Sequence, residues 1–301
     1  MLYILLLTQH IVQIMTLPFY IVDVFADAKY AGNQLAVFLD AENLSSDQMQ
    51  TIAREINFAE STFITKRDAQ NNRADVRIFS PAHEMQFAGH PIIGTSWILM
   101  HKVFENTPEN IKLNVPIGPI AIHSTEELIW LKAAQPKFWD IFSKDEFSAF
   151  SNLKKEDFEN QFPIQEVSTG SAFVLVGLSS KRALENLVLD KDKTDNWLKK
   201  NCKTTHRGLY FYYLEGSKLF SRMLCVENNQ LVEDAATGSA STCLQAFLLK
   251  YHQPELEIIN YQGDYIGRPS QIHFKGKVTN NQFEIQIGGK AQFVAKGEWE
   301  L

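Results

Sequence analysis

The sequence predicts an α+β fold in which strands and helices follow one another unevenly. Many short apolar segments rich in β-branched and aromatic residues run along the 301-residue chain, and most are separated by turn residues. Two segments, 88–103 and 238–251, instead predict helices that are apolar on every side, which is typical of buried helices. Because few strand–helix–strand alternations occur, a doubly wound α/β sheet is disfavoured.

In the first half, alternating and continuous apolar runs predict strands at 19–25, 35–39, 61–65, 74–79, 111–123 and 128–134. The first two strands are joined by a turn at Ala31-Gly32-Asn33. Residues 45–56 predict a helix, because Ser45 and Gln48 form a capping box ahead of one apolar face. Pro91 fits the first turn of the buried helix at 88–103, where its missing N–H costs nothing.

In the second half, residues 135–162 are polar with scattered aromatic residues and predict a crossing between two domains. Short helices are predicted at 181–189 and 193–201. Apolar runs predict the remaining strands, which cover 171–178, 208–214, 218–226, 256–261, 270–274, 283–287 and 291–297.

Composition and charge limit the classes of function. Hydrophobic residues make up 45% and charged residues 21% of the chain, as in ordinary globular proteins, and the length favours two domains. A net charge of −6 without a long basic run argues against nucleic acid as a partner. The three cysteines have no CxxC spacing, so we expect no disulfide framework and a reducing, cytoplasmic location.

The first 14 residues are apolar but contain no Lys or Arg. They are too short to span a bilayer, which takes about 20 residues, and lack the basic region of a secretory signal. We therefore expect no membrane association, and we expect residues 1–14 to be an extension upstream of a native start at Met15. A functional targeting segment is the alternative.

An internal repeat is predicted from spacing. Arg77 precedes Gly89 by twelve residues, and Arg222 precedes Asp234 by twelve. This alignment matches Gly89 with Asp234, and it matches Gly94 with Ser239. A true repeat would place two buried helix starts across one cleft, which is a common ligand site. Chance similarity of two strand–turn–helix units is the alternative.

Three side chains could carry chemistry, and each has a structural alternative. His90 lies at a helix start, where the helix dipole favours the neutral imidazole, but it could also be a structural histidine. Asp234 precedes the second helix and could move protons, although Asp234 or Thr237 could simply cap that helix. Glu60 opens an apolar strand, either as an exposed strand end or as a carboxylate whose raised pKa suits acid/base catalysis.

Well-marked nucleotide, zinc and serine-hydrolase motifs are missing. The chain has no GxxxxGK[ST] loop, no GxGxxG after an early strand and no GxSxG elbow. The segment 83–87 begins like HExxH but lacks the second histidine. We therefore predict no metal and no cofactor. Arg268, in a turn-rich segment, could meet a substrate carboxylate or hold a loop.

Several motifs together resemble the PhzF-like family, named for the phenazine-biosynthesis isomerase. From about Phe19 to Leu301 they are VDVFADAKYAGNQLAVF, IAREINFAESTFI, FSPAHEMQFAGHPIIGTSWIL, EDAATGSAS, QGDYIGRPS and GGKAQFVAKGEWEL. The resemblance implies a diaminopimelate epimerase-like fold with two pseudo-symmetric domains, each a mainly antiparallel sheet curled around a central helix. We expect residues 16–126 with about 286–301 to form one domain and 127–285 the other. A site between the domains and a homodimer are implied as well.

The resemblance also implies site residues. Glu60 corresponds to the family's general acid/base, and His90 and Asp234 to residues that bind the substrate and assist catalysis. We expect a small carboxylate-bearing substrate, and the residues expected to bind it are Asn33, Gly89, His90, Gly238, Ser239 and Ala240.

The predicted function is a cofactor-independent isomerase. Epimerases of this fold use a cysteine at each helix start, whereas Gly89 and Asp234 stand there in the repeat alignment, so a two-cysteine racemase mechanism is disfavoured. Cys243 is expected to be a packing residue. A non-catalytic anion-binding protein, or a hydrolase or lyase, are alternatives. Gln34 and the pair Ala235-Ala236 depart from the residues usual in the family, which leaves the substrate open.

Overall fold

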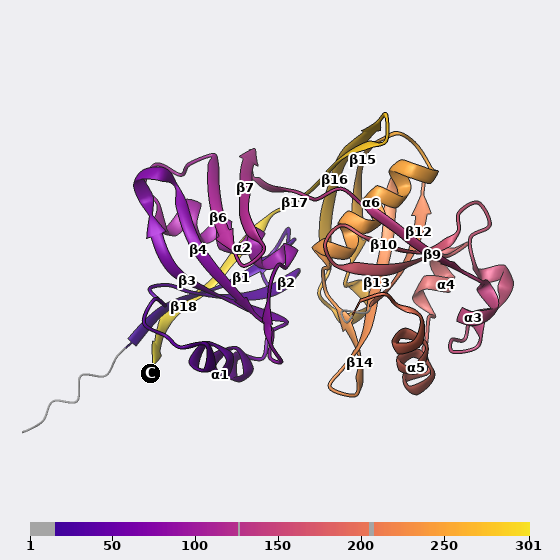
Figure 1. Cartoon of the computed structure of the whole chain (residues 1–301), viewed down its shortest axis with the longest axis horizontal. Coiled ribbons are helices and arrows are strands. Elements are labelled where there is room, and N and C mark those ends of the chain that lie inside the picture. Colours follow the sequence, from indigo (N-terminus) through magenta and orange to yellow (C-terminus); the bar gives the residue numbers. More distant parts are fainter. Residues whose placement is uncertain (1–15, 126, 205–207) are drawn as a thin grey trace, which may run out of the picture.

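A computed structural model describes residues 16–125, 127–204 and 208–301 of the chain. The expected start at Met15 and the segment before it lie outside these residues. The chain folds into two lobes, and each lobe is a curled sheet around one buried helix (Figure 1). This confirms the predicted α+β fold.

The first half of the chain builds most of one lobe. Its elements in order are β1 (Thr16–Val24), β2 (Asn33–Phe38), α1 (Ser46–Ile56), β3 (Glu60–Asp68), β4 (Arg73–Phe79), β5 (Glu84–Met85), α2 (Gly89–Ile98), β6 (Asn110–Val115), β7 (Gly118–Thr125) and β8 (Leu128–Lys132). The helix α2 continues as a π-helical turn, η2 (Leu99–Val103), to the predicted end of the segment. The capping box of Ser45 and Gln48 is present at the start of α1.

The second half repeats the plan. Its elements are β9 (Lys137–Phe142), α3 (Lys144–Ser148), β10 (Ile164–Ser168), β11 (Ala172–Gly177), α4 (Lys181–Glu185), α5 (Lys191–Asn201), β12 (Gly208–Glu215), β13 (Lys218–Glu227), β14 (Gln230–Asp234), α6 (Gly238–Tyr251), β15 (Glu255–Gln262), β16 (Ser270–Thr279), β17 (Gln282–Gly289) and β18 (Ala291–Glu300).

The strand pairings establish the pseudo-symmetry. In the first lobe two strand pairs are parallel, β2 with β3 and β4 with β6. The second lobe has the two equivalent parallel pairs, β11 with β12 and β13 with β15. The strand β9, which follows β8 in the chain, crosses to the second lobe and lies against β10, and the last strand, β18, returns to the first lobe and lies against β1 (Figure 1). Strands β8 and β17 pair with each other and join the lobes.

The central helices explain why the sequence shows no polar face on them. Nearly all of α2 and α6 is buried, and their side chains belong to one apolar core that runs through both lobes. Smaller cores lie elsewhere, one containing residues of α1 and the other residues of α3, α4 and α5. With the helices enclosed, their first turns are held at the junction of the lobes.

The repeat is real, but its predicted alignment is wrong. Phe79 pairs with Glu84 across the β4–β5 hairpin, whereas Leu224 pairs with Glu233 across β13–β14, so the second hairpin is four residues longer. Counting through these pairs, Met85 rather than Gly89 corresponds to Asp234.

The corrected alignment changes the counterparts of Gly89 and Gly94 in the second lobe. Gly89 and Gly238 are the first residues of the two central helices and correspond to each other. The counterpart of Gly94 is therefore Cys243 and not Ser239. A constant spacing from the arginines could not reveal a difference in hairpin length.

Three segments also differ from the prediction. Residues 111–123 form two strands, β6 and β7, rather than one. The expected polar crossing contains β9, α3 and a 3₁₀ turn, η3 (Lys155–Asp157). Glu233 and Asp234 end a strand instead of lying in a turn. Strands β9 and β14 each pair with only one neighbour and expose much of their surface, so their sequences lack the continuous apolar run of a central strand.

Candidate active site

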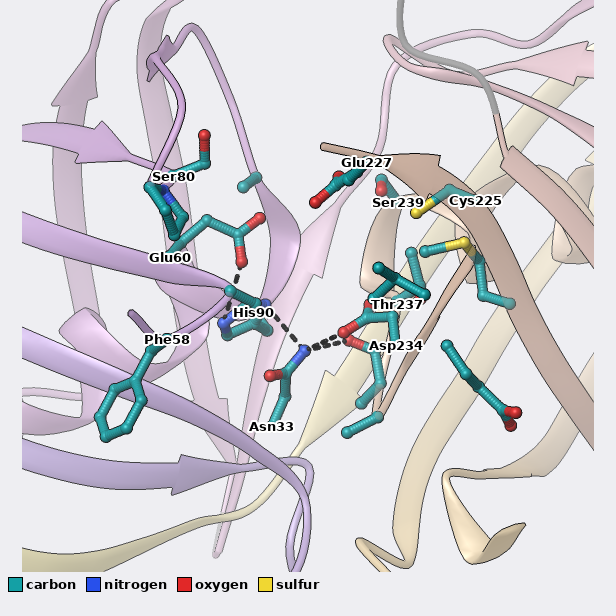
Figure 2. Close-up of a pocket in the computed structure, with 18 of the residues that line it drawn as sticks. Asn33, Phe58, Glu60, Ser80, His90, Cys225, Glu227, Asp234, Thr237 and Ser239 are labelled. Carbon is teal, nitrogen blue, oxygen red and sulfur yellow. Dashed lines mark hydrogen bonds and ion pairs between the residues drawn. The ribbon is translucent and has the colours of Figure 1, made fainter. Parts of the chain in front are cut away.

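A cavity of about 810 Å³ lies between the lobes and is lined by residues of both. Asn33, Glu60 and His90 line it from the first lobe, and Asp234 and Ser239 line it from the second (Figure 2). The fold thus brings together, at one place, side chains that are as much as 206 positions apart in the sequence.

The floor of the cavity is built by the starts of α2 and α6. A Cβ atom on Gly89 would lie 3.2 Å from the Cα atom of Gly238, so the two helix starts nearly touch. Neither helix has a side-chain hydrogen bond at its N-cap residue, which is Ala88 in α2 and Thr237 in α6. Uncapped first-turn N–H groups carry a partial positive charge and can bind an anion.

One predicted binding residue is misplaced. Ala240 is completely buried and does not line the cavity, because the first turn of α6 carries it inward to the core. Gly238 and Ser239, by contrast, both line the cavity. An anion in the cavity would therefore meet the first two residues of α6 and not the third.

Glu60 is the first residue of β3, and its side chain is only 16% exposed. Burial raises the pKa of this carboxyl well above its ordinary value, and the negative charges of Asp234 and Glu227 raise it further. The alternative of an ordinary exposed strand end is therefore wrong. A carboxyl in this environment can hold a proton at a pH where an exposed glutamate would have lost it.

His90 stands beside Glu60 at the start of α2. Its Nε2 lies 3.5 Å from Oε2 of Glu60 and, among the described residues, has no hydrogen-bond partner. Burial lowers the pKa of His90 to about 3, although a backbone hydrogen bond with Gln34 opposes this shift. The imidazole is therefore neutral at physiological pH, and its contact with Glu60 is not an ion pair. A neutral imidazole aimed into a cavity can accept or donate a proton.

Asp234, the last residue of β14, is held by donors from both lobes. Its Oδ1 accepts a hydrogen bond from Asn33 Nδ2 at 2.7 Å, and its Oδ2 accepts one from Thr237 Oγ1 at 2.5 Å. Burial raises the pKa of Asp234 to about 6, against the lowering effect of these hydrogen bonds. Neither Asp234 nor Thr237 caps α6, so the capping alternative is wrong.

Asn33 is the link between the lobes. Besides Asp234, its Nδ2 donates to the carbonyl oxygen of Ala236 at 3.0 Å and lies 3.4 Å from Nδ1 of His90. Because Nδ2 carries two hydrogens, the contact with His90 is the weakest of the three. One amide group thus connects the histidine of one lobe with the aspartate of the other.

The turn before Asn33 is fixed by Arg268. The guanidinium donates to the carbonyl oxygens of Gly32 and Ala31 at 2.9 and 2.8 Å, and it pairs with Asp23 at 2.6 Å. Gly32 has a φ of +67°, and a Cβ there would collide with the carbonyl oxygen of Val24. Of the two roles considered for Arg268, the structure shows the one that holds a loop.

Two residues at the site, Gln262 and Glu227, were not predicted from the sequence. Gln262, at the end of β15, is buried, and its Nε2 donates to the carbonyl oxygen of Asp234 at 2.9 Å and to Thr237 Oγ1 at 3.0 Å. Glu227 lines the cavity at the end of β13 (Figure 2). A sequence signal existed for Gln262, because Asn260 and Gln262 put polar groups at alternate, inward positions of a strand.

Two of the three cysteines, Cys225 and Cys243, are buried, and Cys225 also lines the cavity. Burial raises the thiol pKa of Cys225, and it raises that of Cys243 to about 11. Cys243 lies within α6, where its Sγ contacts the carbonyl oxygen of Ser171 at 3.4 Å. Its expected packing role is consistent with this position.

The described residues contain neither a candidate metal site nor a candidate membrane-spanning helix. Within 16–125, 127–204 and 208–301, no three His, Cys, Asp or Glu side chains gather in a way that could hold a metal ion. None of the helices in these ranges has the length and apolar character needed to cross a membrane.

Comparisons with known proteins show what the chain is similar to in sequence and in fold. The sequence model of the family described as phenazine biosynthesis-like protein, PhzC-PhzF, matches residues 22–297. The chain is 32% identical to a trans-2,3-dihydro-3-hydroxyanthranilate isomerase of Pseudomonas aeruginosa and 34% identical to that of Pseudomonas fluorescens, covering 92% of this chain and 97% of each relative. A crystal structure of a PhzF-family phenazine biosynthesis protein from Bacillus anthracis superposes with a TM-score of 0.85 at 23% identity, over 95% of this chain and 100% of that one.

Proposed function

Because the chain belongs to the phenazine biosynthesis-like family and is an isomerase, we propose that it moves a proton between two carbon atoms of a small carboxylate substrate, with Glu60 as the acid/base group. The observation that carries the proposal is that two partly buried carboxyl groups with raised pKa values, Glu60 and Asp234, line one cavity together with two uncapped helix starts. The reaction needs no electron acceptor, since one proton leaves a carbon atom and one returns to another.

The environment of Glu60 supports its role as the proton carrier. A general acid or base works best when its pKa lies near the operating pH, and burial moves this carboxyl in that direction. The imidazole of His90, 3.5 Å from Glu60, is neutral and therefore does not offset the effect of burial on the pKa of that carboxyl. A positioned group of this kind typically contributes 10²–10⁴-fold, roughly 3–5 kcal/mol of the barrier.

The helix starts support binding of the substrate's carboxylate. Backbone N–H groups at Gly89, His90, Gly238 and Ser239 would receive the anion, because these residues line the cavity at the two positive helix ends. Closing of the lobes on the substrate would exclude water and strengthen these contacts. Asp234 would then accept a hydrogen bond from the substrate.

The relatives named above act, by their names, on trans-2,3-dihydro-3-hydroxyanthranilate, which is a small carboxylate. It is the first candidate substrate for this chain, and three residues of the cavity wall leave the identity of the substrate open. Gln34, Ala235 and Ala236 line the cavity, and they stand where the family usually has proline, proline and a β-branched residue. We therefore propose the class of reaction and not a particular substrate. Gln34, Ala235 and Ala236 would select the part of the substrate that lies against them.

The test is hydrogen exchange in D₂O. The protein is incubated with trans-2,3-dihydro-3-hydroxyanthranilate and with a panel of small unsaturated or α-functionalised carboxylic acids, and deuterium at carbon is followed by NMR and mass spectrometry. Enzyme-dependent uptake of deuterium at carbon, with no other change in elemental composition, is expected. Saturable binding without exchange would identify an anion-binding protein instead, and loss or gain of water or another fragment would identify a lyase or hydrolase.

A homodimer is proposed from the family resemblance alone. Light scattering of the purified protein tests it, with the expected mass being twice the 34.4 kDa of one chain. A mass of one chain at all concentrations would contradict it.

A further inference from the structure

A buried polar cluster lies under Asp234 in the second lobe, and the proposed reaction does not use it. At its centre is the hydroxyl of Tyr210, on β12, which accepts hydrogen bonds from Asn260 Nδ2 at 2.7 Å and Ser221 Oγ at 3.0 Å. The hydroxyl of Ser241, on α6, lies 3.0 Å away. All four residues are almost completely buried. Polar groups cost free energy when they are buried, unless they are paired.

From Tyr210 the hydrogen bonds run in one direction to Asp234. The Tyr210 hydroxyl donates to Gln262 Oε1 at 2.9 Å, and the backbone N–H of Thr237 donates to the same oxygen at 3.2 Å. These two donors fix the orientation of the Gln262 amide. Its Nε2 must then face Thr237 Oγ1 at 3.0 Å, which leaves the single hydrogen of that hydroxyl for Asp234 Oδ2 at 2.5 Å.

The pseudo-symmetry shows that the fold itself does not need this cluster. The registers of β4–β6 and β13–β15 make Val76 the counterpart of Ser221, Leu113 that of Asn260 and Val115 that of Gln262. Along the central helices, Ile92 is the counterpart of Ser241. These four residues of the first lobe are buried and apolar.

At these four positions the first lobe is apolar, whereas the second lobe carries hydrogen-bonding groups. The counterpart of Tyr210 is Thr62, whose hydroxyl lies 2.8 Å from that of Thr95 on α2. The network occurs in the lobe that carries Asp234. The counterpart of Asp234 in the other lobe is Met85, which has no charge to be held.

We propose that Tyr210 and Gln262 are positioning residues that hold the Asp234 carboxylate at the cavity wall through this directed chain of hydrogen bonds. Neither residue touches the substrate in this account. Their effect reaches the site through the Thr237 hydroxyl, whose one hydrogen is kept on Asp234. The proposal rests on the role given to Asp234 in the proposed function, but its test does not depend on catalysis.

The test follows the titration of the Asp234 carboxyl by ¹³C NMR in the full-length protein. Tyr210→Phe removes the hydroxyl and frees the Gln262 amide to turn, so that Thr237 can donate elsewhere. The expected result is a rise in the titration midpoint of Asp234 by about half a unit or more, because a hydrogen bond to the charged form is weakened. Three other titratable groups interact electrostatically with Asp234: Glu60 on β3, and Glu227 and Cys225 on β13. Tyr210→Phe leaves all three in place.

Tyr212→Phe is the matched control. Tyr212 lies two residues along the same strand, is equally buried, and its hydroxyl has no hydrogen-bond partner among the described residues. This variant should leave the Asp234 midpoint unchanged. A shift of the same size in both variants would mean that any loss of a buried hydroxyl disturbs the site, and it would overturn the proposal.

A measurement on the wild-type protein covers the case in which Tyr210→Phe fails to fold. The side-chain amide protons of Gln262 should exchange slowly with solvent, and their chemical shifts should follow the midpoint of Asp234. Fast exchange, or shifts that ignore the Asp234 titration, would overturn the proposal. So would a folded Tyr210→Phe protein in which Asp234 titrates as in the wild type. None of these outcomes bears on whether the protein exchanges substrate protons.

Discussion

Gly89 and Gly238 face each other across the junction of the two lobes, so closely that a Cβ on Gly89 would lie 3.2 Å from Gly238 Cα and 3.3 Å from Ser239 N. The absence of side chains at both helix starts lets two positive helix ends act on one small volume. The same contact makes the relative position of the lobes depend on the size of these two residues.

Gly89→Ala should therefore impair the site although alanine is normally better than glycine in a helix. The added methyl group meets the backbone of α6 in the other lobe, which cannot move aside like a flexible side chain. We expect a loss of about 1–3 kcal/mol in the free energy of unfolding, measured by urea denaturation, together with weaker binding of small carboxylates. A variant as stable as the wild type with unchanged binding would contradict the close approach.

Asp234→Asn should change how stability depends on pH. The pKa of Asp234 is about 6 in the folded protein against an ordinary value of 3.8, so between these values the folded protein keeps a proton that the unfolded chain loses. The stabilisation from Asp234 is complete below about pH 4 and is lost as the pH rises through 6. The asparagine variant should therefore gain roughly 3 kcal/mol relative to the wild type between pH 3.5 and pH 7.

Urea denaturation of both proteins at the two pH values measures this difference. The lowered pKa of His90 acts in the opposite direction between about pH 3 and 6.5, but it is common to both proteins and cancels in the comparison. A stability difference that stays constant with pH would show that Asp234 has an ordinary pKa.

Asn33→Ala should lower kcat/KM roughly 10- to 100-fold, because it removes a hydrogen bond to the charged Asp234 and one to Ala236 across the lobes. Steady-state kinetics with the substrate found by the exchange screen measures the effect. Asn152→Ala is a control away from the cavity, since that exposed amide also donates to a backbone carbonyl, that of Asn186. Equal losses in both variants would argue against the linking role of Asn33.

Alkylation of cysteines with iodoacetamide at pH 7 should leave the isomerase active. Cys225 and Cys243 are buried, their thiol pKa values are raised, and neither stands at a helix start. Activity is measured before and after treatment, with labelling located by peptide mass spectrometry. Because Cys225 lines the cavity, a label on it would also block substrate binding. Loss of activity in Cys225→Ala or Cys243→Ala, rather than inactivation by the label alone, would therefore indicate a thiol mechanism.

The sequence predicted those parts of the fold in which local pattern and burial agree. The two central helices have no polar face because the sheets enclose them, and the Ser45–Gln48 capping box forms within a few residues of chain. Strands β9 and β14 escaped prediction because each has a single neighbour and little apolar surface to bury. Their formation depends on partners that local sequence does not reveal.

Within the site, the sequence identified individual residues but not the contacts between them. The capping pattern around Asp234 looked like an ordinary helix start, since only the tertiary fold brings Asn33 to its carboxylate. The length of the β13–β14 hairpin likewise hid the true counterpart of Gly89. The role of Gln262 depends on Tyr210, 52 residues earlier in the chain, and no local pattern encodes such a contact.

The proton transfer assigned to Glu60 is the central claim, and hydrogen exchange by Glu60→Gln tests it most directly. Wild type and variant are incubated in D₂O with the same carboxylate substrate, and deuterium at carbon is measured by NMR while binding is measured by calorimetry. We predict binding close to that of the wild type with exchange slowed by 10²–10⁴-fold, because the amide keeps the shape of the side chain but cannot carry the proton. Exchange at the wild-type rate in Glu60→Gln would contradict the account.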